Sequence, residues 1–332
     1  MSAIANLGVV GGGAWGTTLA LQAVRAGRSA TLWVREAEVV AAIRAGGDNP
    51  FLPGVKMDPR LHATTDYASL APSDAFLLAA PAQHLRSVCR NLRPHVRKGA
   101  ALAICSKGIE ENSGALLSDV VAAEIPGATI AVLSGPTFAP EIARGLPAAV
   151  TLACGDAAVG QALVEAIGTP TFRPYLAGDI IGAQVGGGVK NVLAIACGIV
   201  SGRKLGDNAR AALVTRGLAE IQRLGRKLGA QPATLMGLSG LGDLVLTCTS
   251  EQSRNYSLGV ALGRGQRAAD VLGARTSVAE GVTTAAAVVT LAKRLGIEMP
   301  ISAAVDAIVN KGAPIDTAVN ALLSRPFRPE EE

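Results

Sequence analysis

The sequence is poor in aromatic side chains and contains no basic runs, and both features argue against nucleic acid as a partner. Phenylalanine, tryptophan and tyrosine together make up 3% of the residues. Binding a single strand would need aromatic stacking platforms, and binding a duplex would need a clustered basic stripe. The net charge of +5 is spread along the chain, which suits a small anionic substrate.

Histidine and cysteine are also scarce. The three histidines, His62, His84 and His95, lie far apart and show no metal-ligand spacing, so we predict no metal site. No Ser-His-Asp or Cys-His constellation has a recognisable context. The five cysteines form no CxxC pair and mostly lie in apolar runs, which favours small core residues in a reducing cytoplasm.

Export and membrane signals are weak. The residues before the first predicted strand include no basic segment and no long apolar one, so we expect no export signal. The apolar run Ile180–Val200 is long enough for a membrane span, but Gln184, Lys190, Asn191 and a row of glycines make insertion costly. We therefore predict no stable membrane insertion.

Lys190 is the one formally charged residue in that apolar run. A strongly hydrated ammonium group is not expected among small apolar residues unless the protein uses it there. Two structural interpretations stay open: a core lysine whose head group reaches water, or a surface lysine on an ordinary helix. Lysine can lose its proton when buried, whereas arginine cannot, and the chain has 23 arginines and only 8 lysines.

A glycine-rich turn follows the first predicted strand, Leu7–Val10. The turn reads GGGAWG over residues 11–16, and a helix is predicted over Thr17–Ala26. In this context the first glycine permits a tight turn, the second lets backbone approach a pyrophosphate, and the third packs helix on strand. The pattern predicts a dinucleotide site at Gly11, Gly13 and Gly16, although glycine-rich turns without ligands also exist.

Arg35 and Glu36 follow the second predicted strand, Ala30–Val34. A carboxylate here would bind a ribose 2′-hydroxyl, whereas an arginine can bind a 2′-phosphate. Arg35 therefore favours NADPH as the cofactor, and Glu36 leaves NADH as an alternative cofactor. The alternative is that Arg35 is a solvated charge at a strand end.

Strand-like and helical segments then alternate up to about residue 174. This pattern indicates an α/β fold with a Rossmann-like, doubly wound and mostly parallel sheet. After Pro174 the pattern becomes almost continuously helical, which predicts an all-α C-terminal domain. We place the dinucleotide-binding domain at 1–187 and the helical, substrate-binding domain at 188–332, with Lys190 at the cleft between them. Further strands are expected over Leu61–Thr64, Ala75–Ala80, Ala100–Cys105, Thr129–Leu133 and Ala149–Ala153.

Polar residues follow several of these strands, at the edge where such sheets bind ligands. Ser106-Lys107-Gly108 follows one strand and Ser134-Gly135-Pro136-Thr137 follows another. Lys107 is either a ligand for an anionic group or a loop lysine in water, and the sequence context leaves both open.

The motifs together resemble the bacterial, soluble type of NAD(P)-dependent glycerol-3-phosphate dehydrogenase. The matching blocks span nearly the whole chain: GGGAWGTTLA at 11–20, LWVR at 32–35, NPFLPG at 49–54, SKGIE at 106–110, SGPTFAPE at 134–141, GGGVKNVLAIACGI at 186–199, GDNARAALVTRGLAE at 206–220, LSGLGDLVLTCTSEQSRNYSLG at 238–259 and AEGVTTA at 279–285. A lone glycine-rich loop would be weak evidence, but this ordered set is specific.

The resemblance implies reversible reduction of dihydroxyacetone phosphate to sn-glycerol 3-phosphate, by a cytoplasmic homodimer that supplies phospholipid synthesis. It implies catalytic roles for Lys190, Asp243 and Thr247. The implied substrate-binding residues are Lys107, Gly135, Thr137, Lys190, Asp243, Ser253, Arg254 and Asn255. The implied cofactor-binding residues, besides the turn glycines, are Ala14, Trp15, Arg35, Lys107, Ala139, Arg254, Val278 and Glu280. Two departures are small: Ala14 stands where many members have serine, and Ala279 where valine is frequent.

The residue chemistry agrees with that implication. A lysine ammonium can stabilise the charge that hydride transfer leaves on a ketone oxygen and can also supply the proton. Arg254 offers the fork-like cation that a phosphate needs. Asp243 as a helix cap and Arg254 as an exposed charge are the structural alternatives. Two other functions compete: a related two-domain reductase of another hydroxy or keto acid, and a non-catalytic cofactor-binding regulatory protein.

Overall fold

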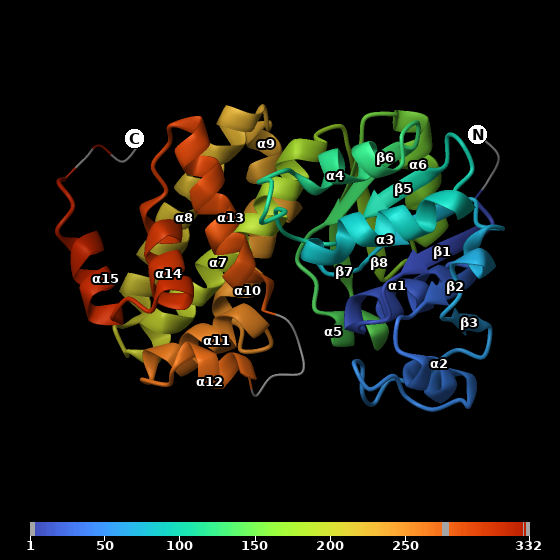
Figure 1. Ribbon diagram of the computed structural model, residues 1–332, viewed down its shortest axis with the longest axis horizontal. Helices are drawn as coiled ribbons and strands as arrows, with labels where there is room; N and C mark the ends of the chain where they lie inside the picture. The colour runs from blue at the N-terminus through green and yellow to red at the C-terminus, as the bar shows by residue number, and fades with distance from the viewer. Residues whose placement is uncertain (1–3, 274–278, 328, 330–332) are drawn as a thin grey trace.

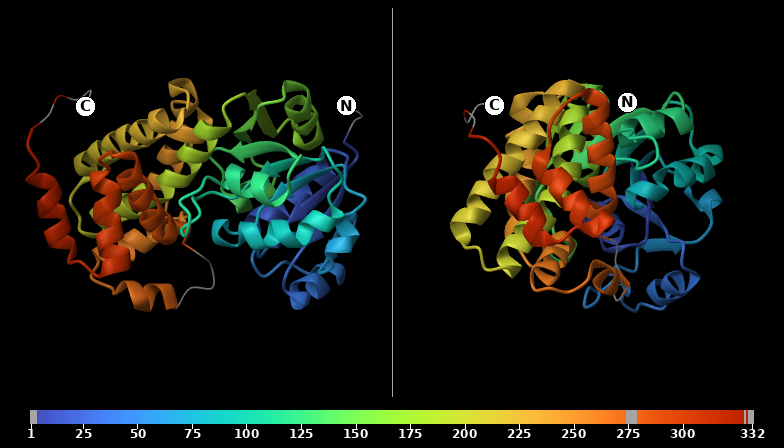
Figure 2. Two further views of the ribbon diagram at one scale, coloured as in Figure 1. Left: turned by 45° about the horizontal axis from the view of Figure 1, so that its top comes forward. Right: turned by 60° about the vertical axis from the view of Figure 1, so that its left-hand side comes forward.

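The computed structural model describes residues 4–273, 279–327 and 329, which form a sheet-containing half and a helical half (Figure 1). The sheet lies toward the N-terminus and the helices toward the C-terminus, and Figure 2 shows the same separation from two further directions. The α/β class with a helical C-terminal part is thus confirmed.

The sheet has eight strands in the order β3-β2-β1-β4-β5-β6-β7-β8. The chain leaves β1 in one direction as far as β3 and then returns past β1 to β4, which is the doubly wound arrangement. All neighbours pair in parallel except β6 and β7, which are antiparallel. The strands are β1 (Asn6–Val10), β2 (Ser29–Trp33), β3 (Leu61–Thr64), β4 (Ala75–Leu78), β5 (Ala101–Ile104), β6 (Thr129–Ser134), β7 (Ala148–Cys154) and β8 (Phe172–Ala177).

Both faces of the central strands are buried because helices cover the sheet on both sides. One apolar cluster includes Leu19 of α1 and Leu163 of α6, and another includes Leu85 of α3 and Val121 of α4. The helices of this half are α1 (Ala14–Arg25), α2 (Ala37–Arg44), α3 (Leu85–Leu92), α4 (Leu117–Glu124), α5 (Ala139–Ala143) and α6 (Ala157–Ile167), with short 3₁₀ turns η1 (Tyr67–Leu70), η2 (Ala82–His84) and η3 (Arg93–His95).

Two expectations about this half are corrected by the structure. The strand β8 runs through Pro174, where the sequence predicted a change to helix. Proline is tolerated there because β8 is an edge strand, paired on one side only with β7. The first helix begins at Ala14 rather than at Thr17, so the glycine-rich turn passes directly into it.

The helical half is organised around α7 (Ile180–Gly202), which contacts α8, α10, α11 and α13. This helix is long and apolar enough to cross a membrane by length and composition, but 83% of its most apolar window is buried inside the protein. It is therefore the core helix of this half. The other elements are α8 (Asp207–Leu228), α9 (Pro232–Leu235), the π-helical turn η4 (Leu238–Gly242), α10 (Asp243–Thr249), α11 (Arg254–Gly263), α12 (Ala268–Gly273), α13 (Glu280–Leu295), α14 (Pro300–Lys311) and α15 (Ile315–Leu323).

Two pairs of glycines bring α7 and α11 into backbone contact. Gly198 and Gly202 on α7 face Gly259 and Gly263 on α11, in each case with three residues between the pair. A Cβ added at Gly198 would lie 2.1 Å from the carbonyl oxygen of Tyr256, and one at Gly259 would lie 2.1 Å from that of Ile195. Only glycine permits so close a crossing.

The chain passes from sheet to helix at Asp179. Its carboxylate caps α7 by accepting from the amide of Gly182 (2.8 Å) and also accepts from the amide of Gln231 (2.8 Å). From there α7 continues without a break across residues 187 and 188, so the division of domains at that point stays a prediction. All five cysteines are free and buried.

Candidate active site

The glycine-rich turn joins β1 to α1 in a shape that side chains would obstruct. Gly11 has φ of 125°, and a Cβ there would lie 2.7 Å from the carbonyl carbon of Ala79. A Cβ at Gly16 would lie 1.8 Å from the carbonyl oxygen of Gly11. A Cβ at Gly13, in contrast, would meet nothing within 4 Å. The turn is therefore closed at Gly11 and Gly16 and open at Gly13, where a ligand could approach the backbone.

The first turn of α1 faces the same opening. Its N-cap, Gly13, has no side chain to cap the helix, which begins with Ala14 and Trp15. The first N–H groups and the positive end of the helix dipole suit a diphosphate. Asn49 supports the turn by donating to the carbonyl of Gly12 (2.9 Å), and Trp15 Nε1 donates to the carbonyl of Cys105 (3.2 Å), next to the loop that carries Lys107.

Arg35 lies just beyond β2, and its side chain is 75% exposed. Its Nε donates to Glu36 Oε1 at 2.9 Å. Arg35 and Glu36, which the sequence analysis treated as alternative ligands of the ribose 2′ group, therefore form an ion pair with each other. An incoming 2′-phosphate would compete with Glu36 for the guanidinium.

Lys190 lies on α7 with only 6% of its side chain exposed. Its ammonium group donates to Asp243 Oδ1 and to Thr247 Oγ1 (2.8 Å). Asp243 is fully buried, and its other oxygen accepts from Lys107 Nζ at 2.6 Å. Lys107 also donates to the carbonyl of Gly135 (3.0 Å). One aspartate thus holds two lysines that come from opposite halves of the molecule.

This arrangement shifts the proton affinity of Lys190. Burial lowers its pKa to about 8, because the charged form loses hydration. The carboxylate of Asp243 opposes this effect, while the positive charge of Lys107 lowers the pKa further. An amine with a pKa near neutrality can both donate and accept a proton under ordinary conditions.

Three consecutive glycines on α7 let this cluster assemble. A Cβ at Gly186 would lie 2.5 Å from the carbonyl oxygen of Ser239, and one at Gly187 would lie 2.4 Å from Ser134 Oγ. A Cβ at Gly188 would lie 3.4 Å from the backbone of Gly108. The helix therefore passes close to the loops that carry Asp243, Gly135 and Lys107, which places Lys190 one turn further along.

A second group of predicted residues gathers where α11 and α13 begin. Ser253 caps α11 by accepting from the amide of Tyr256 (3.2 Å), and Asn255 accepts from the amide of Gly281 (3.0 Å). Glu280 accepts from the amide of Ala82 (3.4 Å). Burial raises the pKa of Glu280, and the nearby charge of Arg254 opposes that shift.

The remaining predicted residues lie around the strand ends. Thr137 Oγ1 donates to the carbonyl of Gly135 (3.2 Å), so it adjoins Lys107. The carbonyl of Ala139 accepts from Thr18 of α1 (3.1 Å), which places Ala139 beside the glycine turn. Val278 lies outside the described residues. Among the described residues, no group of three or more histidine, cysteine, aspartate or glutamate side chains could hold a metal ion.

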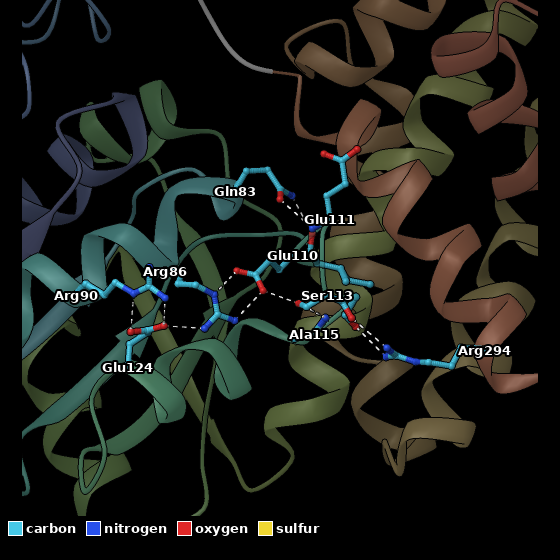
Figure 3. A network of polar contacts seen from close by, with 11 residues as sticks. Gln83, Arg86, Arg90, Glu110, Glu111, Ser113, Ala115, Glu124 and Arg294 are labelled. Atoms are coloured by element: carbon cyan, nitrogen blue, oxygen red, sulfur yellow. Dashed lines mark hydrogen bonds and ion pairs between the residues drawn. The ribbon is translucent and has the colours of Figure 1, made fainter.

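Sequence reasoning overlooked a polar network beside Lys107, which joins Gln83, Arg86 and Glu110 to Arg294 of α13 (Figure 3). No local pattern marks these residues, because their partners lie 24 or more positions away in the chain. The sequence also gave no sign that Lys107 shares Asp243 with Lys190.

Residues 6–160 match the model of the N-terminal part of NAD-dependent glycerol-3-phosphate dehydrogenases, and residues 179–320 match the C-terminal part. The chain is 59% identical over 329 residues to a glycerol-3-phosphate dehydrogenase [NAD(P)+] from Rhodospirillum rubrum, covering 98% of this chain and 94% of that protein. One from Parvibaculum lavamentivorans is 56% identical, with 98% of each chain covered. The crystal structure of glycerol-3-phosphate dehydrogenase from Coxiella burnetii superposes with a TM-score of 0.93 at 40% identity, covering 97% of this chain and 99% of that one.

Proposed function

The chain belongs to the NAD-dependent glycerol-3-phosphate dehydrogenase family, and we propose that it interconverts dihydroxyacetone phosphate and sn-glycerol 3-phosphate with NADPH or NADH. The observation that carries this proposal is the pair of lysines on the buried carboxylate of Asp243. A protein that only bound a nucleotide would have no use for a buried amine with a lowered pKa in this place.

Lys190 is the proton donor and acceptor in this proposal. Bound NADPH or NADH supplies the hydride. In the reductive direction the Lys190 ammonium stabilises the negative charge on the former carbonyl oxygen and gives it a proton, which leaves the amine neutral. In the oxidative direction the neutral amine takes the hydroxyl proton. Asp243 and Thr247 hold the nitrogen in place throughout, and Lys107 supplies a second positive charge beside it.

The phosphate of the substrate is assigned to the start of α11. Arg254 is the first residue of that helix and is exposed, so its guanidinium can reach an anion in the cleft. The dipole of the helix favours negative charge at the same end. Ser253 and Asn255 are assigned to the same end of α11, and Gly135 and Thr137, which adjoin Lys107, are assigned to the rest of the substrate site.

The cofactor is assigned to the glycine turn and its neighbours. Gly11, Gly13, Ala14, Trp15 and Gly16 offer a diphosphate cradle of backbone N–H groups at the start of α1. Arg35 is assigned to the 2′-phosphate, which makes NADPH the favoured cofactor. Ala139, Arg254 and Glu280 are assigned to the walls around it, and the family resemblance places Val278 there as well.

The wider setting is proposed from family membership. We assign the chain to the cytoplasm as a homodimer, where its product would enter phospholipid synthesis. Among the described residues, the one helix long and apolar enough to span a membrane is α7, and it is buried inside the protein.

A substrate panel tests the function. NADPH oxidation is followed with dihydroxyacetone phosphate, with dihydroxyacetone, and with unphosphorylated keto acids. We expect kcat/KM for the phosphate to exceed that for each unphosphorylated compound by about a hundredfold or more, because the charged arginine contact is lost without the phosphate. Equal or higher activity with a keto acid would favour the alternative reductase, and no oxidation with any compound would favour the regulatory protein.

A further inference from the structure

The loop between β5 and α4 carries Lys107 near its start and reaches the helical half at its far end. Lys107 Nζ bonds to Asp243 at the inner end. At the outer end the carbonyls of Ser113 and Gly114 accept from the guanidinium of Arg294 on α13, at 3.0 and 3.3 Å. Figure 3 shows the loop reaching across to the helix that carries Arg294. Hydrogen bonds therefore join the loop to the helical half at both of its ends.

Glu110 is the anchor between these two points. Its carboxylate accepts from both Arg86 Nε and Nη2 at 2.8 Å and from Ser113 Oγ at 2.5 Å. Arg86 lies on α3, so the paired oxygens fix the loop to the sheet half in one geometry. The bond from Arg86 lowers the pKa of Glu110, which keeps the carboxylate charged at neutral pH.

Between these contacts the loop is held by Gln83, by its own backbone and by Ile109, which is fully buried in the apolar core of the helical half. Gln83 donates to the carbonyl of Ile109 and accepts from the amide of Glu111, both at 2.9 Å. The amide of Glu110 donates to the carbonyl of Ala115 (3.1 Å). A displacement of Glu110 is therefore transmitted along three residues of ordered backbone to Lys107.

We propose that Arg86, Glu110, Ser113 and Arg294, here called the loop clamp, are positioning residues that hold the Lys107 ammonium against Asp243. This inference rests on the proposed function, because it concerns the proton donor of that reaction. None of the four side chains bonds to Lys190, Asp243 or Thr247 among the described contacts. They act only through the loop.

The clamp has a chemical consequence at Lys190. Lys107 and Lys190 share one carboxylate, and the charge of Lys107 lowers the pKa of Lys190. If the clamp loosens, Lys107 withdraws, and Lys190 loses a repelling cation and gains a larger share of Asp243. Both changes raise the pKa of Lys190.

The test is the pH dependence of kcat/KM for oxidation of glycerol 3-phosphate between pH 6.5 and 10, with saturating NADP⁺. Oxidation needs the neutral amine, so the rate rises through the pKa of Lys190, which is about 8 in the intact protein. We expect Arg86→Gln and Glu110→Gln to move the midpoint upward by about half a pH unit, and Arg294→Gln to move it less. Loss of folded protein would lower the amplitude of the profile and leave its midpoint unchanged.

Arg90→Gln is the matched control. Arg90 lies one turn from Arg86 on α3, and both bond to Glu124, but only Arg86 reaches Glu110. The control removes the same charge and should leave the midpoint in place. Lys107→Met is the positive control, because it removes the cation outright and should give the largest upward shift.

The outcomes separate the clamp from the proposed function. A wild-type protein without dehydrogenase activity would overturn the proposed function. An active wild type in which Lys107→Met moves the midpoint but Arg86→Gln and Glu110→Gln do not would overturn the clamp alone. A midpoint that is unmoved in Lys107→Met would overturn the link between the two lysines. If Arg86→Gln fails to fold, Glu110→Gln and Ser113→Ala decide the question.

Discussion

The two halves of this protein contribute different chemical groups to the candidate site. The sheet half contributes backbone in the glycine turn, where Gly11 and Gly16 fit only because they lack side chains, and one charged side chain, Lys107, from the loop after β5. The helical half contributes ionised side chains, Lys190 and Asp243, that are buried almost completely. The sheet half should therefore be sensitive to added volume, and the helical half to lost or added charge.

Removal of the buried charge should have the largest effect. We expect Lys190→Ala to lower turnover by about a hundredfold or more, because the proton donor is lost. Binding of NADPH, measured by fluorescence titration, should stay close to that of the wild type, since the cofactor is assigned to the other half. Lys293→Ala, an exposed lysine of the same half, is the control. Unchanged kinetics in Lys190→Ala would remove the catalytic assignment.

Added volume in the sheet half should act on the cofactor instead. The Cβ of Gly16→Ala would overlap the carbonyl oxygen of Gly11, so we expect a lower melting temperature and NADPH binding weakened by more than about tenfold. Gly13→Ala places its methyl group in open space and should keep the melting temperature while weakening NADPH binding. Thermal unfolding and titration of both variants check this. An equal fall in melting temperature in Gly13→Ala and Gly16→Ala would show that the turn is not shaped as described.

Arg35 is a charged residue of the sheet half and is exposed, whereas Lys190 of the helical half is buried. Replacing Arg35 therefore tests how an exposed charge acts on cofactor choice. We expect Arg35→Ala to raise KM for NADPH about tenfold and to change KM for NADH little, since only NADPH has the 2′-phosphate. Glu36→Gln frees the guanidinium from its ion pair and should lower KM for NADPH. Equal effects of Arg35→Ala on both cofactors would refute the 2′-phosphate role.

The smallest effect on catalysis is expected at a buried carboxyl group outside the candidate site. Glu220 of α8 accepts from the amides of Ile301 (2.5 Å) and Ser302 (3.1 Å) at the start of α14. Glu220→Gln replaces one acceptor with a donor, which should cost about 1–3 kcal/mol and lower the melting temperature by several degrees. kcat should not change. A large fall in kcat of the folded Glu220→Gln variant would mean that this carboxyl group affects catalysis although it lies away from Lys190 and Asp243.

Much of the fold could be predicted because its signals are local. The glycine turn, the alternating segments and the apolar run around Lys190 are each contained in about twenty residues. β8 was missed because its burial is irregular and it contains Pro174, both features of an edge strand. The antiparallel pairing of β7 with β6 has no local signal at all.

The structure brings together several residues that the motifs indicated, but the contacts between them could not be read from the sequence. The motif blocks indicated Lys107, Lys190 and Asp243, yet nothing in the sequence showed that one carboxylate holds both lysines. Lys107 and Asp243 lie 136 positions apart, and only the folded chain brings them together. The contacts of the loop clamp were missed for the same reason, since Arg86 lies on α3 and Arg294 lies on α13.

The glycine crossing of α7 with α11 also limits how the substrate range of this enzyme could evolve. Lys190 and Arg254 lie on these two helices, whose backbones touch at Gly198 and Gly259. Under the proposed function, this main-chain contact sets the spacing between the proton donor and the phosphate ligand, and any side chain added at the crossing would clash with backbone. Acceptance of a longer phosphate ester would require a new anion ligand elsewhere in the cleft. We therefore expect selection for such substrates to leave these four glycines unchanged.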